Sequence, residues 1–66
     1  MNITLNGEET KLAANATVTQ LLEQLKLARE RVAVEVNRDI VPKAAYDSHT
    51  LAEGDKVEIV HFVGGG

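Results

Sequence analysis

The pattern that most constrains the fold of this chain is a single amphipathic helix set between segments with the period of strands. Thr17 and Gln20 have the spacing of a capping box, in which two side chains satisfy backbone N–H groups at the start of a helix. The apolar residues that follow recur at i, i+3, i+4 and i+7, the spacing of one helix face: Val18, Leu21, Leu22 and Leu25. We expect this face to lie in the hydrophobic core.

The N-terminal segment alternates apolar and polar residues, which is the pattern of half-buried strands. Strands are expected over residues 1–5 and about 8–13, with Asn6-Gly7 between them. Asn-Gly is a strong hairpin signal, because a type I′ turn needs positive φ at both central positions. The chain is therefore predicted to begin with a β-hairpin.

The second half of the chain continues the strand pattern. Strands are expected at residues 32–36 and 56–62, with a short extended piece at 40–41. Pro42 ends that piece or places it at a sheet edge, and residues 44–47 are expected to form one helical turn. The order of elements predicts an α+β fold, in which one main helix packs on one face of a small mixed sheet.

Composition excludes several classes of protein. The chain has 66 residues, which suffice for one domain with a small core. It contains no cysteine, so disulfides, thiolate metal sites and cysteine nucleophiles are impossible. Its formal net charge of −3 lacks the basic surplus of nucleic-acid-binding proteins. Without a signal-peptide pattern or a long apolar run, we expect a cytoplasmic protein that does not enter membranes.

The histidines offer no catalytic or metal site. His49 is expected in a loop and His61 in the last strand, and neither has a partner at the spacing of a known motif. We therefore expect no bound metal, no bound cofactor and no enzymatic activity of the chain's own.

The last strand predicts a partner-binding surface. Glu58, Val60 and Phe62 share one face, because side chains alternate along a strand. An unpaired glutamate is costly to bury, so this face is expected to be exposed to water. Its apolar residues then form an exposed patch, which is typical of an interaction surface. We expect Val60, Phe62 and the following Val63 to contact a partner.

The chain divides at this point into a folded domain, residues 1–62, and a flexible glycine tail, residues 63–66. Gly64, Gly65 and Gly66 lack a Cβ, so such a tail can enter a narrow channel. Four extended residues reach roughly 13–14 Å at about 3.3–3.6 Å each. A flexible linker is the alternative interpretation of such a glycine run.

A series of short segments resembles the ubiquitin-like β-grasp proteins and, more closely, the sulfur carrier proteins of thiamine biosynthesis. The segments lie at residues 18–22, 34–37, 40–42 and 51–59, and Gly65-Gly66 follows them. The resemblance covers the whole chain and favours a functional tail over a linker. Gly64 departs from the pattern as a third glycine, where another small residue would also serve.

The resemblance implies that the carboxylate of Gly66 is the reactive group. An adenylyltransferase of the ubiquitin-activating type would use ATP and Mg²⁺ to adenylate it. Sulfur from a donor such as a cysteine desulfurase would then displace AMP, and thiazole synthase would take sulfur from the resulting thiocarboxylate. Three alternatives remain: a ubiquitin-like modifier of lysine amines, a sulfur carrier for molybdopterin synthesis, and a plain binding domain with an inert tail.

Overall fold

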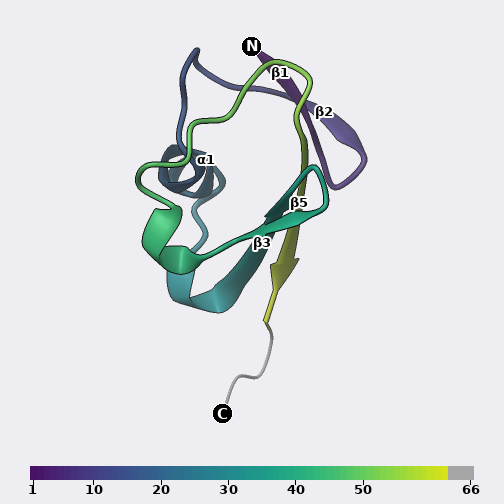
Figure 1. Ribbon diagram of the computed structural model, residues 1–66. Coiled ribbons are helices and arrows are strands. Elements are labelled where there is room, and N and C mark those ends of the chain that lie inside the picture. The colour runs from purple at the N-terminus through teal and green to yellow at the C-terminus, as the bar shows by residue number, and fades with distance from the viewer. Residues whose placement is uncertain (63–66) are drawn as a thin grey trace.

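The computed structural model describes residues 1–62, which form two layers, a five-stranded sheet and one α-helix (Figure 1). Helix α1, Val18–Leu25, lies against one face of the sheet. Two 3₁₀ turns, η1 at Arg29–Arg31 and η2 at Lys43–Ala45, join the larger elements. The strands are β1 Asn2–Leu5, β2 Glu8–Lys11, β3 Val32–Val36, β4 Asp39–Val41 and β5 Lys56–His61.

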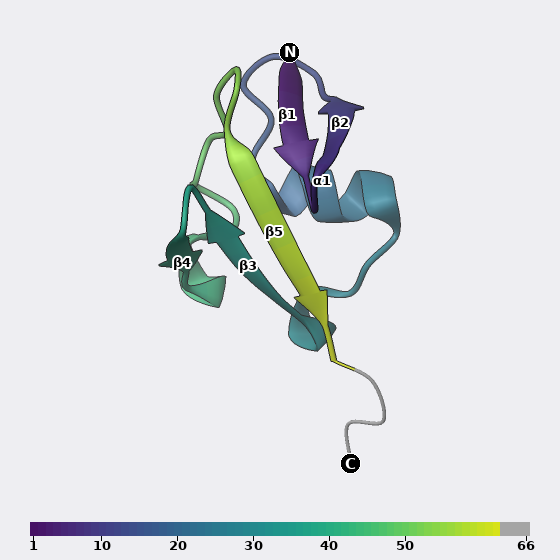
Figure 2. The same ribbon diagram turned by 90° about the vertical axis from the view of Figure 1, so that its right-hand side faces the viewer.

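The sheet is mixed and has the order β2-β1-β5-β3-β4, so the last strand lies at its centre (Figure 2). β1 and β5 are parallel, with Thr4 opposite Lys56, while the other neighbours are antiparallel. β4 is an edge strand and ends directly before Pro42, as the sequence predicts. This mixed sheet with a single covering helix confirms the predicted β-grasp fold.

The N-terminal hairpin turns at Asn6 and Gly7, whose φ angles are 48° and 85°. Positive φ at both positions confirms the predicted turn. The second strand is shorter than predicted and ends at Lys11 instead of Ala13. Leu12 still donates its N–H to the carbonyl of Met1 at 2.8 Å and is buried, but the chain then leaves the sheet towards the helix.

The capping box is present as predicted. The Thr17 hydroxyl oxygen accepts a hydrogen bond from the backbone N–H of Gln20 at 3.2 Å. In return, the Gln20 side-chain oxygen accepts one from the N–H of Thr17 at 2.9 Å. The helix ends where Lys26 adopts a left-handed conformation, with φ 59°, and donates its N–H to the carbonyl of Glu23.

The core lies between α1 and the sheet. Val18, Leu21 and Leu22 are buried as predicted, while Leu25 is only partly buried at the edge of the core. They meet the inward side chains of β3 and β5, and Tyr46 is among the largest fully buried side chains. The buried apolar residues are Ile3, Leu12, Ala16, Val18, Leu21, Leu22, Val32, Val34, Val36, Val41, Tyr46, Leu51, Val57 and Ile59.

The helical turn predicted at residues 44–47 begins one residue earlier, at Lys43. The shift follows from Pro42, whose fixed φ of −64° sets the start of the turn directly after it. Tyr46 closes this turn by donating its N–H to the carbonyl of Lys43. No helix within residues 1–62 is long and apolar enough to cross a membrane.

Candidate functional site

The candidate site begins with the outer face of the sheet, which we define as the face opposite α1 (Figure 2). In β3 and β5 the buried valines and Ile59 point towards α1, and the residues between them point outward. The outer face of this region therefore carries Ala33, Glu35, Ile40, Glu58 and Val60. Ala33 is the cross-strand partner of Val60, and Glu35 is the partner of both Glu58 and Ile40.

Three large apolar side chains are exposed in the region around this face. Val60 is 59 % exposed and Phe62 48 %, which confirms that both are accessible, as the sequence predicts. Ile40, at 74 %, is the most exposed of the three and is not among the residues predicted to contact a partner. The signal was available, because inward Val41 forces its strand neighbour to the opposite face. Exposed apolar side chains grouped in this way are typical of interaction surfaces.

Phe62 is held at the end of β5 by its backbone and its ring. Its N–H donates to the carbonyl of Arg31 at 2.7 Å. The Lys43 ammonium lies 6.0 Å from the centre of the Phe62 ring, at the outer limit of a cation–π contact. The same ammonium donates to the carbonyl of Val32 at 2.6 Å. These contacts join η1, η2 and β3 to the residue after which the glycine tail begins.

A polar cluster lies behind this end of the sheet. The Arg29 guanidinium lies 5.4 Å from the centre of the Tyr46 ring and pairs with the Asp47 carboxylate at 3.2 Å. The hydrogen bond from the Thr19 hydroxyl, with the charge of Arg29, holds the pKa of Asp47 below its usual value. Burial raises the pKa of the Tyr46 phenol. With Asp47 ionised and Tyr46 neutral at pH 7, this cluster has a structural role.

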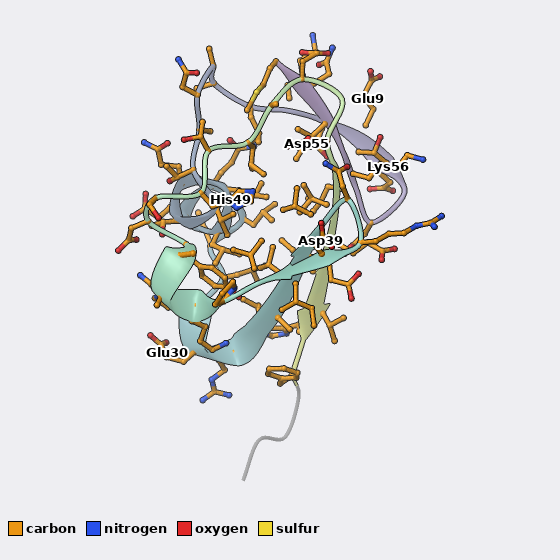
Figure 3. The ribbon with its side chains drawn as sticks, viewed as in Figure 1. Glu9, Glu30, Asp39, His49, Asp55 and Lys56 are labelled. Atoms are coloured by element: carbon orange, nitrogen blue, oxygen red, sulfur yellow. The ribbon has the colours of Figure 1, made fainter. Side chains whose placement is uncertain are left out.

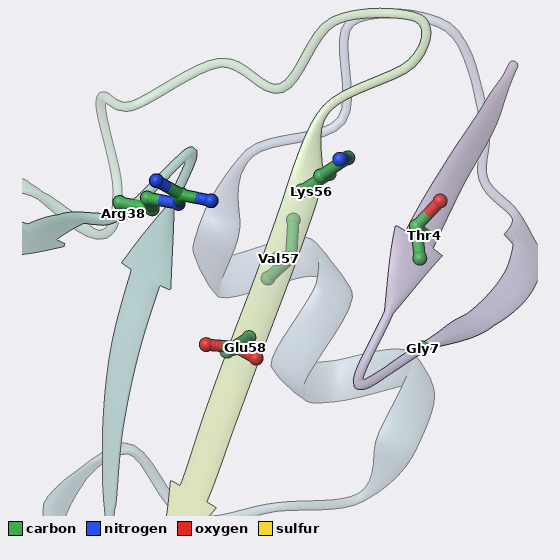
Figure 4. Close-up of a pocket in the computed structure, with 6 residues that line it drawn as sticks. All are labelled: Thr4, Gly7, Arg38, Lys56, Val57 and Glu58. Carbon is green, nitrogen blue, oxygen red and sulfur yellow. The ribbon is translucent and has the colours of Figure 1, made fainter.

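An open hollow of about 200 Å³ lies over the first residues of β5, with Arg38 on one side and Thr4 of β1 on the other (Figure 4). Two basic residues, Arg38 and Lys56, line it together with Glu58. Thr4, Gly7 and Val57 complete its lining. A hollow this small and open cannot enclose a substrate of ordinary size.

The two histidines lie apart from each other. His49 is half-buried in a loop and offers its carbonyl to the N–H of Val18, whereas His61 is exposed at the end of β5. The carboxylates of Glu30 and Asp55 lie away from His49 (Figure 3). Within residues 1–62 no three potential ligands come together to hold a metal ion.

The remaining predicted site residues are Val63, Gly64, Gly65 and Gly66, and they lie outside the described residues. Their predicted roles, as partner contact, tail and reactive terminus, stay predictions. What the structure provides is their starting point, directly beyond Phe62 at the end of the central strand.

Comparison with known proteins agrees with this arrangement. The model of the ThiS family matches residues 3–66. The sulfur carrier protein ThiS of Bacillus subtilis is 41 % identical over 63 residues, covering 94 % of this chain and 96 % of that protein. The crystal structure of the thiamine biosynthesis protein ThiS of Geobacter metallireducens superimposes with a TM-score of 0.84 at 42 % identity, over all of both chains.

A longer relative has a different name. A thiazole synthase of Paramagnetospirillum magneticum is 47 % identical over 66 residues, which are all of this chain and 20 % of that protein. The chain thus spans one fifth of the length of this relative. The family match over nearly all of the sequence, together with the shared fold, shows that the chain belongs to the ThiS family.

Proposed function

We propose that this protein is a sulfur carrier whose Gly66 carboxylate is converted to a thiocarboxylate for thiazole formation in thiamine biosynthesis. The observation that carries the proposal is the family match, which runs through residue 66 and so includes the Gly65-Gly66 end. The protein would be a substrate of its partner enzymes and not itself a catalyst.

The chemistry explains why an activating enzyme is required. A carboxylate is a poor electrophile, because its negative charge repels nucleophiles. An adenylyltransferase of the ubiquitin-activating type would supply ATP, with Mg²⁺, and convert the Gly66 carboxylate to an acyl adenylate. The terminal sulfur of a persulfide, on a donor such as a cysteine desulfurase, then attacks the acyl carbon and displaces AMP. A thiol reductant cleaves the S–S bond of the resulting acyl disulfide and releases the thiocarboxylate. With no cysteine in the chain, this terminal acyl group is the place where sulfur can be carried.

The surface around Phe62 supports a mechanism in which the folded domain docks on the partner and the tail carries the reactive group. Val60 and Phe62 are exposed at the end of β5, directly before the tail, and Phe62 is anchored through Arg31. When a partner docks on this surface, the start of the tail would lie directly at the surface of the partner. Docking would then supply the free energy for ordering the tail, roughly 1–2 kcal/mol per residue.

A protein modifier is the second candidate, since it needs the same activated glycine terminus. In that case the acyl group would be joined to a lysine amine of another protein. The curated relative from Bacillus subtilis, named as a sulfur carrier, favours the first candidate. A sulfur carrier for molybdopterin synthesis would use the same chemistry with a different acceptor.

Intact-mass measurement of the protein isolated from its own cells tests the proposal. A carrier is expected to contain a fraction in which one oxygen has been exchanged for sulfur at Gly66. That fraction should grow when thiazole synthase is depleted, because the acceptor of the sulfur is then missing. Isopeptide-linked adducts on other proteins, without any thiocarboxylate, would show a modifier instead.

A further inference from the structure

The outer face combines exposed apolar side chains with two carboxylates that lie directly opposite each other. Glu35 of β3 and Glu58 of β5 are paired in the antiparallel register. Directly opposed side chains in such a pair have Cβ atoms about 4.5–5.5 Å apart, and like charges there are destabilising. In the folded protein without a partner, the repulsion between these two carboxylates is therefore destabilising.

The cations of the chain do not neutralise this pair. Within residues 1–62 neither glutamate side chain takes part in an ion pair or a hydrogen bond. Arg38 and Lys56 line the same hollow as Glu58, but neither comes within ion-pair distance of it. Glu58 is exposed and Glu35 half-buried, so both carboxylates remain open to a cation from outside.

Apolar side chains stand on two sides of the glutamates. Ile40 is the cross-strand neighbour of Glu35, and Val60 follows Glu58 on the same face of β5. They are 74 % and 59 % exposed. An arginine suits this combination, because its planar guanidinium can bridge two carboxylates while its methylenes contact aliphatic neighbours.

We propose that the outer face around Glu35, Glu58, Ile40 and Val60 docks thiazole synthase through a surface arginine that lies between the two carboxylates. This inference rests on the proposed function and extends its partner surface beyond the end of β5. Thiazole synthase is the partner that the relatives support, since a protein of that name contains a segment 47 % identical to this whole chain. The positive charge of the arginine compensates the two carboxylates, and its binding removes the repulsion between the glutamates.

The test compares two double variants with the same change in net charge. E35Q/E58Q removes the opposed carboxylates, and the control E9Q/E23Q removes two exposed carboxylates on β2 and α1. Binding of each variant to purified thiazole synthase is measured by calorimetry over a series of salt concentrations. We expect E35Q/E58Q to raise the Kd by about tenfold or more and to flatten its salt dependence. The control should change the Kd by less than about twofold.

Thermal unfolding of E35Q/E58Q distinguishes loss of a contact from damage to the fold. Its midpoint is expected to equal or exceed that of the wild type, because the like-charge repulsion is gone. Equal losses of affinity in both double variants would overturn the proposal, since they would reflect net charge alone. So would unchanged binding of E35Q/E58Q to thiazole synthase.

A separate measurement keeps this proposal distinct from the sulfur-carrier function. The adenylyltransferase, ATP and a sulfur donor are added to E35Q/E58Q, and the intact mass is recorded. We expect thiocarboxylate to form as in the wild type, because the altered residues face thiazole synthase. If the wild type itself gains no sulfur, the proposed function fails, whereas calorimetry still decides whether Glu35 and Glu58 contribute to binding of thiazole synthase.

Discussion

The backbone N–H of Phe62 donates to the carbonyl of Arg31 at 2.7 Å, so the residue before the glycine tail is tied to the segment that precedes β3. The hydrogen bond continues the β3–β5 ladder by one residue beyond Val32 and His61. It fixes where the backbone leaves the sheet. The exposed ring of Phe62 is thereby held at one place on the surface, next to Val60.

Phe62→Ala is expected to weaken partner binding much more than folding. Its ring is 48 % exposed, so the free energy of unfolding should fall by about 1 kcal/mol or less. An aromatic anchor of an interface, in contrast, contributes enough that affinity should drop about tenfold. Denaturant unfolding and titration with the adenylyltransferase measure the two effects. A variant that loses stability and keeps its affinity would show that Phe62 serves only the fold.

Leu22→Ala tests the core of the domain. Leu22 is 2 % exposed and packs between α1 and the sheet, so the variant should lose about 2–5 kcal/mol. A domain of this size has roughly 3–10 kcal/mol in total, and the loss should be plain in a urea titration. Glu23→Ala, at an exposed position of the same helix, is the control and should change stability by about 0.5 kcal/mol or less.

Asn6 does more than form a turn, which leads to a further prediction. Its side-chain oxygen accepts a hydrogen bond from the N–H of Ile59 at 2.8 Å, and its amide donates to the Ile59 carbonyl at 3.2 Å. The Asn6 side chain thus pairs the backbone N–H and C=O of Ile59 in β5, beyond the last residue of β1. Asn6→Ala should cost about 1–3 kcal/mol, because both groups of Ile59 lose their partner. Asn15→Ala is the control, since Asn15 also has positive φ, at 64°. Equal losses of stability in the two variants would show that the side-chain hydrogen bonds of Asn6 contribute nothing beyond the preference of asparagine for positive φ.

Asp47 should make stability depend on acid pH. The Thr19 hydroxyl and the Arg29 charge hold the pKa of Asp47 below the usual value of an aspartate. The stability that ionised Asp47 contributes to the folded state is therefore complete above about pH 4. It is lost as the pH falls through the folded-state pKa. Between about pH 4 and pH 2, the stability of Asp47→Asn should fall less steeply than that of the wild type. Thr19→Val keeps the carboxylate but removes the donor, and it should also flatten the profile. Parallel profiles for all three proteins would contradict this role.

The elements that depend on local pattern could be predicted from the sequence. The capping box of Thr17 and Gln20 and the turn at Asn6-Gly7 are set by residues close in the chain, and both are present. The end of α1 could not be predicted in the same way. Lys26 takes a left-handed conformation that usually favours glycine, because Leu27 must turn back to the core, where its N–H meets the carbonyl of Leu22.

The candidate site was predictable only in part, for a related reason. Alternation along one strand sufficed to place Val60 and Phe62 on the exposed face. The pairing of Glu35 with Glu58, and of Ile40 with Glu35, depends on which strands become neighbours and in which register. Those contacts join residues up to 23 positions apart in the chain, and the register of the paired strands cannot be predicted from a single sequence.

The most direct test of the account concerns the terminal carboxylate itself. The wild type, a variant lacking Gly66 and a variant with one residue added after Gly66 are each incubated with the adenylyltransferase, ATP and the sulfur donor, and their intact masses are measured. We expect the wild type to exchange one oxygen for sulfur and both variants to stay unchanged while keeping the wild-type unfolding midpoint, because their carboxyl carbon is displaced by about one residue, some 3.3–3.6 Å. Sulfur gained at the wild-type rate by the variant without Gly66 would contradict the account, since the Gly66 carboxylate would then not be the reactive group.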